Sequence, residues 1–346
     1  MALTPQAEVI FRPKGTLGHV TLNRPKALNA LTYEMCAAML GQLREWARDP
    51  EIRAVVVDAV PGRAFAAGGD IRAIYDAGKK HDGSVLKFFE TEYRLNAAIR
   101  HFPKPHVALI DGIAMGGGAG ISIHGSHRVV SENALLAMPE TAIGLFPDIG
   151  ASYFLNRLPG ELGMYLALTG VRIGSADAIY TGLATDFVPA ARLSGIVPRL
   201  SQGEAPDAVL ADLRQRPAMP APLAAHRDAI DRVFAADSVE GILAALKNEG
   251  HWGKETVDLF MSRSPTSLKL TFRQLRQGAK LDFDSCMQME FRIVARAMEG
   301  HDFYEGVRAA LIDKDQKPRW VPQFLEDVSE QEIARYFAPL EVELTL

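Results

Sequence analysis

Two acidic residues stand in an apolar, proline-containing stretch near the middle of the chain. Glu140 follows Met138 and Pro139, and Asp148 follows Phe146 and Pro147. Isolated loop carboxylates are usually solvated surface groups or helix caps, but these apolar neighbours favour burial. An apolar wall raises the pKa of a carboxyl group and suits it to proton transfer near neutral pH. Glu140 and Asp148 are therefore candidate catalytic acids on the two arms of one bent loop.

A glycine-rich run precedes these acids. Residues 115–120 read Met-Gly-Gly-Gly-Ala-Gly, between an expected strand, His106–Ile110, and an expected helix, Ile121–His124. Glycines at the start of a helix allow close approach of the backbone and leave N–H groups free at the positive end of the helix dipole. Such donors suit a carbonyl oxygen that becomes negative during a reaction. The alternative is that the glycines only permit tight helix packing.

Several familiar glycine motifs do not fit this run. Ile121 breaks the dinucleotide pattern GxGxxG, Ser126 stands where a P-loop needs lysine, and His124 breaks the GxSxG pattern of serine esterases. The sequence also lacks histidine pairs at HExxH-type spacing. We therefore expect no nucleotide fold, no serine nucleophile and no metal site here.

Composition indicates an ordinary globular protein. The 346 residues are 48% hydrophobic and 23% charged, with a net charge of -4 and no long Lys/Arg run, which argues against nucleic acid as a partner. Cys36 and Cys286 have no metal-binding spacing, so we expect reduced thiols. Residues 1–8 lack a basic segment followed by an apolar block, so we expect no secretory signal, no membrane span and a cytoplasmic location.

The elements that must position these residues alternate between strand and helix up to about Val188, which predicts an α/β core. An N-terminal hairpin is expected over residues 9–23, and Asn29 is the expected N-cap of the long helix that follows. From Leu223 to Ala309 only helical patterns occur, including a helix at Pro265 with Ser264 as its cap. We expect a core over residues 1–200 and a helical region over 201–346 that covers it.

Three motifs resemble the crotonase (enoyl-CoA hydratase/isomerase) superfamily. They are NRPKALNAL at Asn23–Leu31, FAAGGDI at Phe65–Ile71 and IDGIAMGGG at Ile110–Gly118. Five further motifs are similar to those of the 3-hydroxyisobutyryl-CoA hydrolases within that superfamily. These are FFETEY at Phe88–Tyr93, MPETAIGLFPD at Met138–Asp148, SPTSLK at Ser264–Lys269, GHDFYEGVR at Gly300–Arg308 and DKDQKPRW at Asp313–Trp320.

The resemblance implies a spiral of ββα units with a C-terminal helical extension, and an acyl-CoA substrate whose coenzyme A makes a separate cofactor unnecessary. It implies an oxyanion hole from the N–H groups of Gly69 and Gly117. It also implies contacts of the acyl-CoA with Ala27, Asp70 and Ile71, a substrate contact for Glu92, and Glu140 and Asp148 as paired acids. Relatives of this superfamily often form trimers, so a homo-oligomer is a further expectation.

One departure from the family pattern separates two activities. Hydratases carry a glutamate three residues after the oxyanion glycine, where this chain has Gly120. Hydration of a double bond usually needs an acid and a base, so the resemblance favours hydrolysis of a short β-hydroxyacyl-CoA, 3-hydroxyisobutyryl-CoA above all, as in valine catabolism. A hydratase- or isomerase-type lyase and a non-catalytic acyl-CoA-binding module remain alternatives. Glu140 would act either as the nucleophile or as the base.

Overall fold

The computed structural model describes residues 7–80 and 83–346. Residues 1–6, on which most of the expectation of a missing secretory signal rests, lie outside the described residues. Within the described part, no helix is both long and apolar enough to cross a membrane. Both cysteines are buried free thiols.

The chain divides into two compact units. The first unit holds the described residues up to Asp70, with Arg94–Leu136 and Ile173–Ala221. The second unit holds Ile71–Tyr93, Ala137–Arg172 and Pro222–Leu346. Each unit is made of three separate segments of the chain, whereas the sequence predicted a single boundary at residue 200. That the C-terminal region covers the core stays a prediction.

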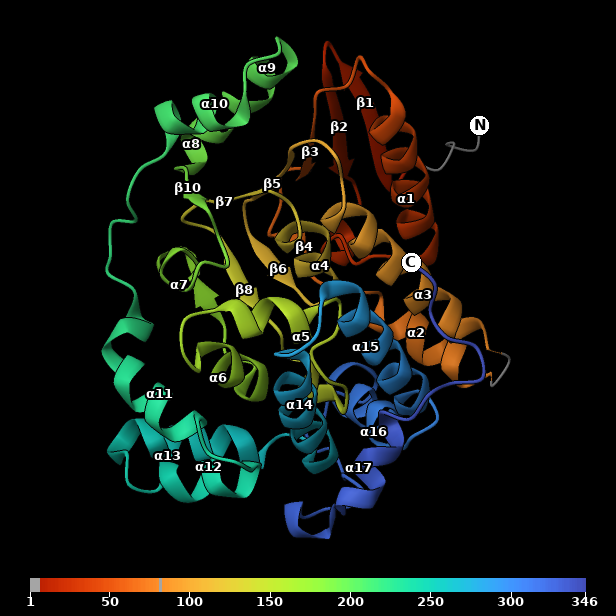
Figure 1. The fold of residues 1–346 in the computed structure, drawn as a ribbon, viewed down its shortest axis with the longest axis vertical. Helices are drawn as coiled ribbons and strands as arrows, with labels where there is room; N and C mark the ends of the chain where they lie inside the picture. Colours follow the sequence, from red (N-terminus) through yellow and green to blue (C-terminus); the bar gives the residue numbers. More distant parts are fainter. Residues whose placement is uncertain (1–6, 81–82) are drawn as a thin grey trace. The chain divides into compact units, whose positions relative to one another are not determined.

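The first unit contains two sheets (Figure 1). The larger sheet has the order β1 (Val9–Lys14), β2 (Leu17–Leu22), β3 (Ala54–Ala59), β5 (His106–Ile110), β7 (His127–Val130) and β10 (Asp186–Phe187). β1 and β2 form the predicted antiparallel hairpin, and the remaining neighbours pair in parallel. The smaller sheet has the order β4 (Ala64–Ala66), β6 (Ile113–Met115), β8 (Leu135–Ala137) and β9 (Ile173–Gly174).

The central strands of the larger sheet are apolar and buried on both faces, and helices cover them. They are α1 (Tyr33–Arg48), α4 (Gly117–Ile123), α7 (Ser175–Thr181), α8 (Ala190–Leu193), α9 (Ile196–Ser201) and α10 (Pro206–Leu213). One core cluster joins Val56 and Val107 of the strands to Ile196 of α9 and Leu210 of α10. Helix α3 (Ser84–Arg100) contributes residues to both units.

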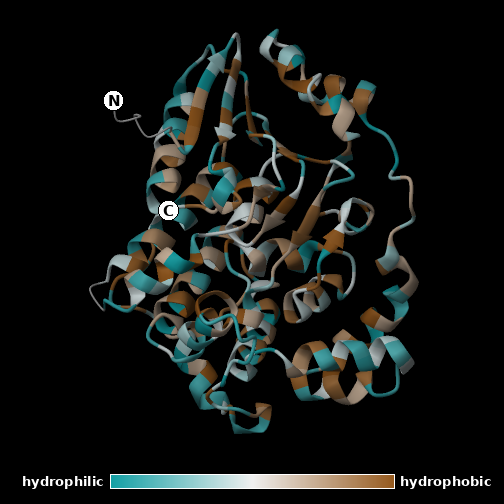
Figure 2. Cartoon of the chain, turned by 180° about the vertical axis from the view of Figure 1, so that it is seen from behind, coloured by the Kyte–Doolittle hydropathy of each residue, from teal (hydrophilic) through white to brown (hydrophobic). Residues whose placement is uncertain are grey.

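The regular structure of the second unit is mainly helical among its described residues. Its α-helices are α2 (Ile71–Gly78), α5 (Ala151–Phe154), α6 (Leu162–Thr169), α11 (Arg227–Phe234), α12 (Val239–Leu246), α13 (Gly250–Met261), α14 (Pro265–Gly278), α15 (Phe283–Ala297), α16 (Asp302–Val307) and α17 (Glu330–Tyr336). Figure 2 shows brown and teal alternating along α12 and α13, and Val239, Ile242 and Leu246 of α12 are its buried face. This spacing is that of amphipathic helices.

Local signals predicted several element boundaries and failed at others. The Ser264 cap is confirmed, because its side chain accepts the N–H of Ser267 at the start of α14. The Asn29 cap is wrong: Thr32 caps α1, whereas Asn29 has a φ of +54° and donates its amide to the carbonyl oxygen of Ala64. The helix after the glycine run begins at Gly117 rather than at Ile121, so the glycines form its first turn.

Candidate active site

Glu140 is the first residue of a short 3-10 turn, η2 (Glu140–Ile143), in the second unit. Pro139 precedes it, and Gly144 ends the turn with a left-handed φ of +70°. The carboxyl group is buried, and its Oε2 atom has no hydrogen-bond partner among the described residues. A buried unpaired carboxyl oxygen is costly, and such a group is available to a substrate.

Asp148 is buried in the loop that follows η2. The Tyr93 hydroxyl donates to its Oδ2 atom at 2.8 Å. The preceding carbonyl oxygen, that of Pro147, accepts a hydrogen bond from the side-chain amide of Gln274 on α14. Residues of α3 and α14 thus hold this loop from two sides.

Glu92 completes an acidic cluster (Glu92, Glu140 and Asp148). It lies on α3, directly before Tyr93, and is buried with its Oε1 atom unpaired among the described residues. Burial raises the pKa of Glu92 well above its usual value, and the charge of Asp148 adds to the rise.

Burial also raises the pKa values of the other two members of the acidic cluster. Burial, and then the charge of Asp148, raises the pKa of Glu140 well above its usual value. Burial raises the pKa of Asp148 to about 7, against the hydrogen bond of Tyr93, which lowers it. Because neighbouring carboxylates disfavour each other's ionisation, the cluster retains a proton near neutral pH. It is suited to general acid–base chemistry.

Two residues of this region were not predicted as functional. Tyr93 ends the FFETEY motif and was given no role of its own, yet its hydroxyl donates a hydrogen bond to Asp148. Glu290 on α15 is fully buried and accepts hydrogen bonds from the N–H groups of Gly150 and Ser152, just after Asp148. The available signal for Glu290 is a charged residue on the apolar face of a helix, flanked by Met287 and Ile293 at helical spacing.

Two glycine junctions, the segments Gly68–Gly69 and Gly116–Gly118, meet within the first unit. A Cβ atom built at Gly68, whose φ is +108°, would lie 3.1 Å from the carbonyl oxygen of Met115 and 3.7 Å from the Gly117 nitrogen. Gly118 likewise packs so closely on the carbonyl oxygen of Ala66 that a side chain would collide with it. The approach of these segments requires glycine.

Two backbone N–H groups in this region, those of Gly69 and Gly117, take no part in the hydrogen bonds that form their own bridge or helix. Leu31 bridges this segment through the carbonyl oxygen of Gly68 and the N–H of Asp70, which leaves the N–H of Gly69 outside the bridge. Gly117 is the first residue of α4, where N–H groups have no acceptor within the helix. That these two N–H groups form an oxyanion hole, as the resemblance implied, stays a prediction.

The predicted acyl-CoA contacts are divided between the units. Ala27 ends a 3-10 turn next to the Gly69 segment, because Leu28 accepts the N–H of Ala67. Asp70 forms an ion pair with Arg24 at 2.9 Å. Ile71 begins α2 in the second unit, which also holds the acidic cluster.

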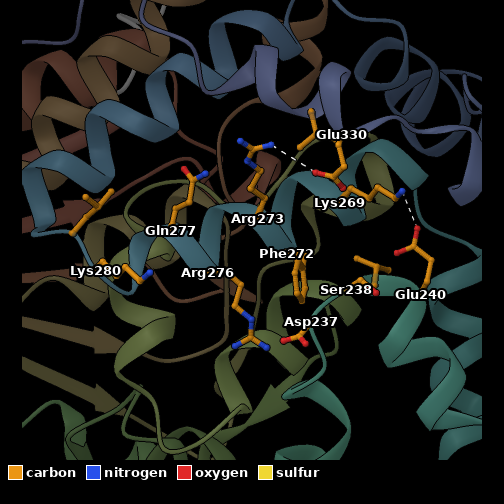
Figure 3. A pocket seen from close by; sticks show the side chains of 13 residues that line it. Asp237, Ser238, Glu240, Lys269, Phe272, Arg273, Arg276, Gln277, Lys280 and Glu330 are labelled. Carbon is orange, nitrogen blue, oxygen red and sulfur yellow. Dashed lines mark ion pairs between the residues drawn. The ribbon is translucent and has the colours of Figure 1, made fainter.

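A further pocket of about 700 Å³ lies in the second unit, between α12, α14 and the start of α17 (Figure 3). Lys269 pairs with Glu240 at 2.8 Å, and Arg273 with Glu330 at 3.8 Å. No predicted site residue lines this pocket, and neighbouring acids offset these two cations. Among the described residues, no group of three His, Cys, Asp or Glu side chains could hold a metal ion.

Comparison with known proteins places the chain in a family. The family profile described as enoyl-CoA hydratase/isomerase matches residues 17–337. The chain is 47% identical over 343 residues to the mitochondrial 3-hydroxyisobutyryl-CoA hydrolase of Xenopus tropicalis, covering 96% of this chain and 89% of the relative. It is 44% identical to the human protein of the same name, with the same two coverages.

Solved structures agree in fold. The chain is similar to a Mycobacterium thermoresistibile protein described as a carnitinyl-CoA dehydratase, with a TM-score of 0.94, 39% identity and coverage of 98% of this chain and 99% of that one. It is also similar to a Rhodobacter sphaeroides protein described as an enoyl-CoA hydratase, with a TM-score of 0.92, 40% identity and coverage of 98% and 100%. The expected crotonase fold is confirmed. The chain therefore belongs to the enoyl-CoA hydratase/isomerase family.

Proposed function

We propose that this protein hydrolyses the thioester of a short β-hydroxyacyl-CoA, with 3-hydroxyisobutyryl-CoA as the first candidate and 3-hydroxyisobutyrate and coenzyme A as the products. The observation that carries the proposal is the buried pair Glu140 and Asp148, whose pKa values are both raised. Relatives named 3-hydroxyisobutyryl-CoA hydrolase, 44–47% identical, support the choice of substrate.

Polarisation of the thioester is assigned to backbone donors. The N–H groups of Gly69 and Gly117 bind the carbonyl oxygen and stabilise the negative charge that develops on it. Losing one such donor typically costs about 2.7–4 kcal/mol of barrier. Ala27, Asp70 and Ile71 contact the acyl-CoA, and Glu92 contacts the acyl portion.

Glu140 acts on the carbonyl carbon by one of two routes. As a nucleophile, its carboxylate forms a mixed anhydride and coenzyme A leaves as the thiolate; water then cleaves the anhydride and restores Glu140. As a general base, it takes a proton from the water that attacks. Asp148 holds the substrate hydroxyl and supplies the proton that the departing thiolate takes up. A pKa of about 7 suits Asp148 to that transfer.

A lyase is the second candidate. It is favoured by the solved structures described as a dehydratase and a hydratase, which are 39% and 40% identical to this chain. Against it stands Gly120, at the position where hydratases carry a second carboxylate. Without a carboxylate at position 120, hydration of a double bond would have to take both its acid and its base from the cluster of Glu92, Glu140 and Asp148.

A panel of acyl-CoA substrates separates the candidates. Release of coenzyme A, followed with a thiol-reactive dye, is expected with 3-hydroxyisobutyryl-CoA and related β-hydroxyacyl-CoAs. Hydration of crotonyl-CoA, followed by loss of its enoyl absorbance, is expected to be slower by orders of magnitude. Hydration faster than thiol release identifies a lyase, and substrate binding without turnover identifies a binding module.

The route of hydrolysis has its own test. A single turnover in solvent enriched in heavy oxygen places label in Glu140 if an anhydride forms and water cleaves it at the Glu140 carbonyl carbon. General-base catalysis, or water attack at the acyl carbon of the anhydride, places the label in the product alone. Two further expectations stay predictions. One is a cytoplasmic location, which differs from the word mitochondrial in the names of the relatives; the other is a homo-oligomer.

A further inference from the structure

Asp148 precedes a turn in which one residue, Ile149, has an unfavourable backbone conformation. Ile149 has a φ of +54° and Gly150 a φ of +88°, and α5 begins at the next residue. A left-handed φ is unusual for a β-branched residue and persists only where the surroundings hold it. The position of the Asp148 carboxyl group therefore depends on whatever holds this turn.

Glu290 is the side chain that holds it. Its Oε2 atom accepts the N–H of Gly150 at 2.6 Å, and its Oε1 atom accepts the N–H and the hydroxyl of Ser152 at 2.8 Å and 2.6 Å. Burial raises the pKa of Glu290 to about 8, against these hydrogen bonds, which lower it. Three donors directed at one buried carboxyl group compensate much of the cost of removing it from water.

Tyr93 holds the carboxyl group itself. Its hydroxyl donates to Oδ2 of Asp148 at 2.8 Å. The ring is fully buried and packs edge-on against Phe89 and Phe291, with centroids 6.2 Å and 6.1 Å away. Phe291 follows Glu290 on α15, so one helix fixes both the turn and the ring that reaches Asp148.

We propose that Tyr93 and Glu290 are positioning residues for Asp148: Tyr93 takes the Oδ2 atom so that Oδ1 faces the substrate, and Glu290 fixes the turn that carries the carboxyl group. The inference rests on the proposed function, because it presumes that Asp148 acts on the substrate. It adds the two residues that set the geometry and protonation of this acid.

Among the ionisable groups around Asp148, Tyr93 differs from the others in its effect on the Asp148 carboxylate. The groups that interact electrostatically with Asp148 are Glu92 and Tyr93 on α3, Glu140 on η2 and Glu290 on α15. The three carboxyl groups disfavour the Asp148 carboxylate when they are charged, whereas the Tyr93 hydroxyl stabilises it. Burial and the charge of Asp148 raise the pKa of Tyr93, so it remains a donor.

The Tyr93→Phe variant tests the hydrogen bond. Because a hydrogen bond to a charged group is lost, the limb of the pH–rate profile that belongs to Asp148 is expected to move up by about one to two pH units. Tyr304→Phe is the matched control, since its hydroxyl donates to the carbonyl oxygen of Met298 at 2.7 Å. Equal profiles for wild type and Tyr93→Phe overturn the role of Tyr93, as does the same displacement in the control.

The Glu290→Gln variant tests the turn. Glutamine keeps one acceptor oxygen but turns an NH₂ group toward donors, so a fall in kcat of about 10- to 100-fold is expected. The KM should change little, and Glu290→Asp should recover part of the rate. Asp302→Asn is the control, since Asp302 is also buried and accepts from Ser264 and Val321 at 2.6 Å and 2.8 Å. A kcat equally reduced in the control, or unchanged in Glu290→Gln, overturns the role of Glu290.

A titration without substrate separates this inference from the proposed function. The apparent pKa of Asp148 is followed by carbon NMR of labelled aspartate in wild type and in Tyr93→Phe, with Asp148→Asn to assign the signal. If wild type lacks hydrolysis but the pKa is higher in Tyr93→Phe, the proposed function fails and the hydrogen bond stands. If wild type hydrolyses the thioester and the pKa is unchanged, the function stands and the role of Tyr93 is overturned.

Discussion

Replacing Asp148 by Asn should stabilise the folded protein at alkaline pH while it abolishes the proposed proton transfer. In the folded chain burial raises the pKa of Asp148 from 3.8 to about 7. Ionisation of Asp148 is therefore unfavourable in the folded state, whereas asparagine, of nearly equal size, does not ionise. The amide oxygen of asparagine can still accept the hydroxyl of Tyr93.

The size and sign of the effect follow from linkage. Between the unfolded and folded pKa values the folded state binds more protons, so the free energy of unfolding falls as pH rises. The contribution is fully present below about pH 4 and is lost as pH rises through about 7. A rise of about three pKa units, at about 1.36 kcal/mol each, corresponds to about 4 kcal/mol. The advantage of Asp148→Asn over wild type should therefore grow by about 4 kcal/mol across this range.

Urea unfolding of both proteins at about pH 4 and about pH 8 measures this difference. The quantity compared is the change in the variant's advantage between the two pH values, because a new amide group adds a pH-independent cost of its own. If the advantage is the same at both pH values, Asp148 is not a buried acid with a raised pKa, and the reasoning fails.

Three further substitutions test other parts of the structure. Gly68→Ala should lower kcat/KM by about 10-fold or more, because a methyl group 3.1 Å from the Met115 carbonyl oxygen displaces the glycine junction; steady-state thiol release measures it. Ser264→Ala should lower the free energy of unfolding by about 1–2 kcal/mol through loss of the α14 cap, as urea unfolding will report. Arg273→Gln should leave both quantities within about 1 kcal/mol of wild type, since its pair with Glu330 is long and exposed.

Periodicity and composition predicted much of the fold. The N-terminal hairpin forms within residues 9–23 as predicted, and the strand His106–Ile110 has its predicted bounds. These elements were predictable because each depends on the pattern of apolar and polar residues within its own short segment. Asn29 failed as a cap because its amide is used by β4, and that contact joins residues far apart in the chain.

The candidate site was predicted only in part, because local sequence indicates burial but not contacts between residues far apart in the chain. The proline and apolar neighbours of Glu140 and Asp148 predicted that these side chains are buried, and both are. Tyr93 and Glu290 were missed because their roles depend on hydrogen bonds across 55 and 140 residues of chain. Helical spacing can mark Glu290 as a charged residue on an apolar face, but it does not identify the distant residues that these side chains contact.

The role of Glu140 is measured by the initial rate of thiol release from 3-hydroxyisobutyryl-CoA, compared between wild type and Glu140→Gln. Glutamine matches the buried glutamate in size but can neither attack the thioester nor accept a proton from water. We expect rapid release by wild type and a loss of about 10²–10⁴-fold in kcat for the variant, with substrate affinity retained. Release of thiol by the variant at nearly the wild-type rate would mean that Glu140 does not carry out the reaction.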